Sequence, residues 1–119
     1  MIEIKETSRE LTKVEKYLMT QSPEIQSLKD VEDGSVINVT AFCRFEDIKE
    51  DSGEAVDLLA ILDDSDNSYV TQSATFIRSF MDIVKLFEAG EIIPVKKISA
   101  TAKNGRPYVN CVLDTASLK

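Results

Sequence analysis

The sequence predicts a mainly β fold, in which five strands form one small barrel and a single helix lies between the third and fourth strands. Three observations predict it. Five strand-like segments follow residue 35, the apolar period changes from 2 to 3.6 between the third and the fourth, and 119 residues is the length of one domain. We therefore expect a single domain over residues 1–119, with residues 1–23 as an N-terminal helical extension.

The N-terminal extension is expected to contain a short amphipathic helix over residues 7–19. Leu11, Val14 and Leu18 recur at helical spacing, and Lys and Glu occupy the positions between them. A Gln-Ser-Pro sequence then ends the helix, and residues 27–34 form a loop that leads to the first strand. The pattern leaves open whether this helix docks on the barrel or pairs with a second copy of the chain.

The first strand is expected over residues 36–45, because apolar residues occupy alternate positions there. The opposite parity contains Phe42 and Arg44, so an exposed ring beside a guanidinium is one interpretation. The alternative is a reversed or bulged strand with Phe42 in the core. The alternating apolar set is Ile37, Val39, Ala41, Cys43 and Phe45.

Two further strands are expected over residues 55–62 and 69–72. The charged segment 46–54 contains an Asp-Ser-Gly turn and joins the first strand to the second. The acidic segment 63–68 joins the second strand to the third. We expect it to be a solvated turn rather than a calcium loop, because the glycine and glutamate of that motif are missing.

The helix between the third and fourth strands is expected over residues 75–88, where the apolar period is 3.6. Ser73 or Thr75 can cap its start, and Gly90 followed by Pro94 marks its end. The apolar stripe consists of Phe76, Phe80, Ile83, Val84 and Phe87.

The last two strands are expected over residues 94–101 and 107–113, joined by a hairpin turn at residues 103–106 that contains Asn-Gly. Five strands with a helix between the third and fourth are typical of the OB-fold, a small Greek-key barrel. Another small α+β sheet is the alternative.

Charge is distributed unevenly along the chain. The net charge is −7, and residues 1–91 carry nine basic and twenty acidic side chains, whereas residues 92–113 carry four basic side chains and no acidic one. An OB barrel binds single strands across its second and third strands, between the loops that follow strands one and four. Such binding needs cations for phosphates and flat rings for bases. The sequence therefore suggests a nucleic-acid site.

The candidate site residues combine the late basic segment with aromatic rings on the expected binding face. Solvated strand edges are the alternative for the strand lysines, and a strand-end tyrosine with a hydrated hydroxyl is the alternative for Tyr69. The candidates are Lys96, Lys97, Lys103, Arg106, Tyr108, Tyr69, Arg44 and Phe42.

Other function classes find little support. The chain has no His, so a Ser/His or Cys/His nucleophile pair cannot form, and four glycines provide no phosphate-binding loop. We expect no enzyme, no cofactor and no metal. Cys43 and Cys111 are interpreted as buried free thiols. The longest apolar run has five residues and the N-terminus is charged, so we expect no membrane span, no secretion signal and a cytoplasmic location.

Four features appear in one order: Gly34 before the alternating strand, the segment 69–76 that opens the helix, the helix end at residues 87–90, and the hairpin turn at residues 103–106. In these features the chain from residue 28 to residue 110 resembles the small single-stranded DNA-binding proteins of tailed bacteriophages that coat displaced strands during protein-primed replication.

The resemblance implies an OB-fold and binding of single-stranded DNA without sequence preference. It also implies a role in DNA replication in the host bacterial cytoplasm, with replication proteins as further partners. It assigns site roles to Tyr69, Lys103 and Arg106. The alternative function is an acidic adaptor or inhibitor module that binds a basic protein.

Overall fold

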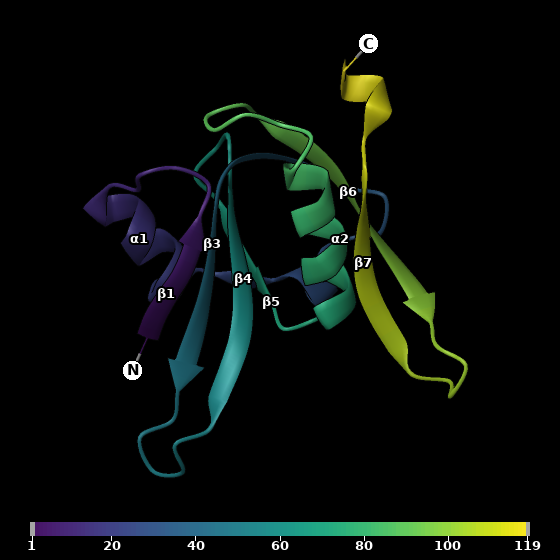
Figure 1. Ribbon diagram of the computed structural model, residues 1–119. Coiled ribbons are helices and arrows are strands. Elements are labelled where there is room, and N and C mark those ends of the chain that lie inside the picture. Colours follow the sequence, from purple (N-terminus) through teal and green to yellow (C-terminus); the bar gives the residue numbers. More distant parts are fainter. Residues whose placement is uncertain (1, 119) are drawn as a thin grey trace.

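The computed structural model describes residues 2–118 and contains one mixed sheet, curled into a half-barrel, with two α-helices (Figure 1). The helices are α1 (Lys13–Thr20) and α2 (Ala74–Val84), and two short 3-10 helices are η1 (Leu28–Asp30) and η2 (Thr115–Leu118). The strands are β1 (Ile2–Thr7), β2 (Gln26–Ser27), β3 (Val36–Ile48), β4 (Ala55–Asp63), β5 (Ser68–Thr71), β6 (Ile93–Thr101) and β7 (Pro107–Leu113).

The sheet has the order β2-β5-β4-β3-β6-β7, and β1 also pairs with β3. All pairs are antiparallel except β2 with β5. The mainly β prediction is confirmed, and the curled sheet is consistent with an OB-like fold. Five strands were predicted, but the sheet of the described residues has seven, because β1 and β2 join it.

The N-terminal extension is a strand followed by a helix, so the prediction of a helix from residue 7 was wrong at its start. The 13-residue β3 pairs with β6 only at its first four residues, which leaves the edge beyond them free for β1. The helix begins later because Thr12 forms a capping box with Glu15. The Thr12 hydroxyl accepts from the Glu15 amide at 3.1 Å, and the Glu15 carboxylate accepts from the Thr12 amide at 2.9 Å.

A bulge in β3 reverses which face of the strand points inward. The register against β4 shifts between Val39 and Ala41, and the Thr40 hydroxyl donates to the Leu62 carbonyl at 3.2 Å. Before the shift Val39 faces the same core as Phe42 after it, whereas Ala41 faces the opposite side. The prediction that one apolar parity lines a single face through residue 45 was therefore wrong, and the bulged alternative is confirmed.

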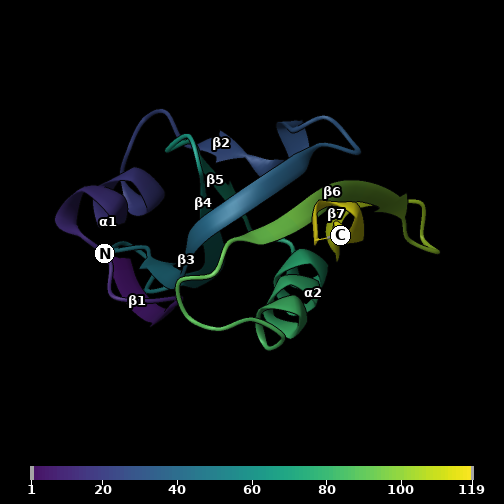
Figure 2. The same ribbon diagram turned by 90° about the horizontal axis from the view of Figure 1, so that it is seen from above.

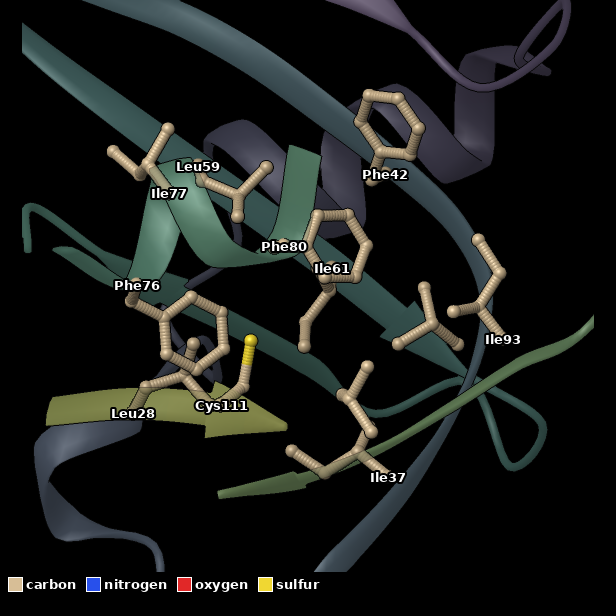
Figure 3. Close-up of a cluster of buried hydrophobic side chains, with 12 residues drawn as sticks. Leu28, Ile37, Phe42, Leu59, Ile61, Phe76, Ile77, Phe80, Ile93 and Cys111 are labelled. Atoms are coloured by element: carbon tan, nitrogen blue, oxygen red, sulfur yellow. The ribbon is translucent and has the colours of Figure 1, made fainter. Parts of the chain in front are cut away.

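The two faces of β3 and β4 are covered by different helices. Under α2, Phe42 meets Phe80 edge to face at 5.5 Å between ring centroids, and Phe76 stacks on Phe80 at 6.4 Å (Figure 3). On the other side, Leu11 and Met19 cover the second core. Figure 2 shows α1 and α2 on opposite sides of β3 and β4. The rest of the second core is Ala41, Cys43, Phe45, Ala60 and Leu62.

Both cysteines are buried free thiols, as predicted. Burial raises the pKa of Cys43 to about 11 and that of Cys111 to about 12. Both side chains are therefore protonated near neutral pH and act as small apolar core residues.

A buried lysine ties the segment before β3 to β6. Lys97 is only 3% exposed, and its Nζ donates to the Val31 carbonyl at 2.7 Å and to Asp33 Oδ1 at 2.6 Å. The Ser99 hydroxyl donates to the same carboxylate oxygen at 2.8 Å. The hydrogen bond from Lys97, followed by that from Ser99, lowers the pKa of Asp33. This polar cluster fixes the segment in place.

Replacing Lys97 with Met should lower the free energy of unfolding by about 1–3 kcal/mol, because the Val31 carbonyl loses its donor in a buried setting. Urea unfolding at pH 7 measures the change. Lys103→Met removes the same charge from an exposed turn and should shift stability by less than about 0.5 kcal/mol. Equal losses in the two variants would contradict a structural role for Lys97.

The start of α1 should depend on pH. Arg9 Nη2 lies 2.7 Å from Glu15 Oε2 and, together with the Thr12 amide, holds the pKa of Glu15 at about 2 instead of 4.5. Because the folded-state pKa is depressed, the stabilisation is complete above pH 4.5 and is lost as the pH falls toward 2. Glu15→Gln should cost about 1 kcal/mol at pH 7, as loss of a capping contact does.

Urea unfolding at a series of pH values tests this, with Glu24→Gln as an exposed control outside α1. The difference between wild type and Glu15→Gln should shrink as the pH falls from 4.5 toward 2, the window set by the Glu15 pKa in the unfolded and folded states. A difference that stays constant with pH would contradict the ionic contribution.

Candidate nucleic-acid interface

An open groove lies between β5, the start of α2, and β7, with a volume of about 1040 Å³. Among the described strands, β5 and β7 form no ladder with each other, so the sheet leaves a seam there. One side chain bridges it. The Ser73 hydroxyl donates to the Val109 carbonyl at 2.9 Å and accepts from the Phe76 amide at 3.2 Å, which caps α2.

The groove has an excess of positive charge on a protein that is acidic overall. Lys29 from η1 and Arg106 from the β6–β7 hairpin line it, both side chains are exposed, and neither forms an ion pair within residues 2–118. Asp30 is the one acidic residue among the lining side chains. The remaining polar wall is formed by hydroxyl and amide groups of Ser27, Thr71, Gln72, Ser73, Thr75 and Ser99.

The hairpin between β6 and β7 positions the basic end of the groove. The Ala102 amide donates to the Arg106 carbonyl at 2.9 Å, and the Asn104 side chain accepts from the Arg106 amide at 3.1 Å. Gly105 has a φ of +83°, a conformation that other residues rarely adopt. The predicted hairpin turn at residues 103–106 is therefore confirmed, and it holds Arg106 at the groove.

Tyr108 also lines this groove. It lies on β7 directly opposite Ala100 of β6, and such a small neighbour covers little of the ring. The first turn of α2 reaches the groove at Ala74 and Thr75. The backbone N–H groups of a first helical turn carry partial positive charge. The groove thus combines cations, hydroxyl donors and a flat ring, the groups that bind phosphates and stack on bases.

Of the candidates from sequence, Arg106 and Tyr108 line the groove. Lys103 is exposed on the same hairpin but does not line the groove itself. Lys96 does not line the groove, and its Nζ is 3.9 Å from Asp114 Oδ1. The late basic segment is therefore divided between the groove and other surfaces.

Two candidates are buried and were wrong as surface contacts. Phe42 is 2% exposed and packs against Phe80, because the bulge turns it inward. Lys97 lies on the same inward face of β6 as Val95. Its ammonium group donates to the Val31 carbonyl and to the Asp33 carboxylate. Neither side chain can reach a strand that lies on the surface.

Two more candidates are separated from the groove. Tyr69 packs against the first core, and its hydroxyl donates to Asp63 Oδ2 at 3.1 Å. Burial, followed by the charge of Asp63, raises the pKa of Tyr69. Arg44 lines a different hollow, on the far side of α2, and its Nη2 lies 2.9 Å from Asp57 Oδ2.

The expected binding platform is largely covered. The strand was expected to lie across the second and third predicted strands, which are β4 and β5, but α1 packs on their outward face through Met19, and Leu11 just before the helix is buried with it. Only Leu58 and Val70, at one end of this face, line the groove. The β3–β4 connection at residues 46–54, expected to be a wall of the site, does not line it either.

The sequence analysis missed Lys29, which supplies the second free cation of the groove. The only feature of the sequence that could have indicated Lys29 is its position in the Leu-Lys-Asp sequence at residues 28–30, shortly before the first long strand. The fold brings it to the site because Leu28 is completely buried and β2 pairs with β5 beside it. Neither charge density nor periodicity marks such a residue.

Residues 2–118 contain no cluster of three or more His, Cys, Asp or Glu side chains that could hold a metal ion. Neither α-helix in this part of the chain is long and apolar enough to cross a membrane.

Comparison with known proteins identifies the family. A family model described as phage single-stranded DNA-binding protein, of the phi29 type, matches residues 4–114. No curated protein and no solved structure gave a significant match. The matched region contains the groove and both helices, and the family is one of binding proteins rather than enzymes. The chain therefore belongs to the family of phage single-stranded DNA-binding proteins of the protein-primed type.

Proposed function

We propose that this protein coats and protects single-stranded DNA during phage DNA replication in the host cytoplasm, and that the strand lies in the groove between β5 and β7. The observation that carries this proposal is that Lys29 and Arg106, two exposed cations without an ion-pair partner among the described residues, line one groove together with Tyr108. Family membership favours single-strand binding over the adaptor alternative.

Each part of the groove has a separate role in this proposal. Lys29, Arg106 and the nearby Lys103 neutralise phosphates, and Tyr108 stacks on a base. Hydroxyl groups such as those of Thr75 and Ser99 donate to backbone oxygens of the strand. None of these contacts distinguishes one base from another, because phosphates are identical and every base has a flat face. Binding is therefore independent of sequence.

The same geometry supports an OB-like barrel made of β3 to β7. Their order, β5-β4-β3-β6-β7, brings the two outer strands toward each other, and the hydrogen bond from Ser73 to Val109 joins them where ladder pairing is absent. In this proposal β1 and β2 are additions to the barrel. Because α1 covers the outer face where such barrels hold single strands, the strand lies in the seam instead.

Fluorescence anisotropy of a labelled oligo-dT, titrated at several salt concentrations, tests the function. Three phosphate contacts should make log affinity fall with log salt at a slope of about −2. The double variant Lys29→Glu/Arg106→Glu should lose most of the affinity, because two attractive contacts become repulsive. Tyr108→Ala should cost about 1–3 kcal/mol of binding free energy.

Lys13→Glu is the matched control, because it reverses an exposed charge on α1, on the far side of β3 and β4. A negative charge at the first helical position also suits the helix dipole, so this variant should fold normally. Its affinity should stay close to that of wild type. No binding by wild type at low salt, or equal binding by the groove variant and the control, would overturn the proposal.

A further inference from the structure

A second hollow, of about 400 Å³, lies on the other side of α2, against β3 and β4. Ala74, the first residue of α2, lines both this hollow and the groove, so the two cavities meet at the start of the helix. Figure 1 shows the β3–β4 and β6–β7 hairpins extending on either side of that point. The two hollows are therefore neighbours at the start of α2.

The second hollow also has more positive than negative charge. It is lined by Arg44, Arg78 and Lys85, against Asp57 and Asp82. Arg78 is exposed and forms no ion pair in the described chain. The two pairs that exist join partly or well exposed groups, Arg44 with Asp57 at 2.9 Å and Lys85 with Asp82 at 3.5 Å. Such surface pairs are weak, so their cations stay available to an anionic ligand.

Arg44 gives an independent indication that this hollow is incomplete without a ligand. Its Nε is buried and has no hydrogen-bond partner, the one such side-chain atom in residues 2–118. Buried donors without partners are rare in folded proteins, because the lost hydrogen bond to water is not replaced. A ligand oxygen that drew the guanidinium group outward into the hollow would give Nε a partner.

We propose that the bound single strand continues beyond the groove, crosses the start of α2 at Ala74, and is held in the second hollow by Arg78 and Arg44. The inference rests on the proposed function and extends its site. From Ala74 to Lys85 the helix rises about 16 Å. At about 3.4 Å per stacked nucleotide, a strand that follows the whole helix would add up to about five nucleotides to the site.

A ladder of labelled oligo-dT lengths, from 5 to 20 nucleotides in steps of about 2–3, tests this within the size range of OB-type sites. Wild type should show a step in affinity when the oligonucleotide becomes long enough to pass Ala74. Arg78→Glu should bind short oligonucleotides normally and lose the step, with about tenfold weaker binding of long ones. Lys13→Glu, with the same charge change on α1, should retain the step.

Arg78→Ala is the second variant, and circular dichroism confirms that each variant is folded. Because Arg78 is exposed on a helix, alanine should preserve the fold, and the salt slope on long oligonucleotides should become shallower by about 0.7. Failure of wild type to bind any length would overturn the proposed function. Normal wild-type binding, with the same length dependence in Arg78→Glu, would overturn only the second hollow.

Discussion

The bulge at Thr40 of β3 is the constraint on which the architecture depends. One extra residue lets Ile37 and Val39 share an interior with Phe42, and it bends a 13-residue strand so that its two halves pair with different neighbours. The bend makes β6 and β1 occupy successive parts of the same edge of β3. The curl of the sheet, and therefore the seam between β5 and β7, follows from this bend.

The same bulge determines where α1 must lie. Beyond Thr40, Ala41 and Cys43 point away from the interior under α2, and together with Phe45 they form an apolar outer surface. Burial of that surface requires a cover, which is provided by Met19 of α1 and by Leu11 just before the helix. The cover occupies the face on which OB barrels hold single strands, and the proposed site therefore lies in the seam.

Ion pairing decides which cations of this acidic protein are available to DNA. Lys97 is buried against Asp33, and Lys96 lies near Asp114, so neither adds a free charge to the groove. Lys29, Arg78 and Arg106 have no acidic partner among the described residues and lie in the two cavities that meet at Ala74. A net charge of −7 is compatible with single-strand binding because, in the proposed site, the strand contacts only this local surface.

Local patterns in the sequence determined much of this protein. The 3.6-residue period located α2, Asn-Gly located the last hairpin, and Arg106 and Tyr108 followed from their place beside that turn. The bulge, the capping box at Thr12, the pairing of β1 with β3 and the arrival of Lys29 at the groove were decided by tertiary structure. The physical reason is that alternating apolar residues in the sequence define the two faces of a strand, but not the residue at which a bulge switches the buried face. In the same way, the sequence shows where a cationic side chain is, but not which acidic residue it pairs with in the fold.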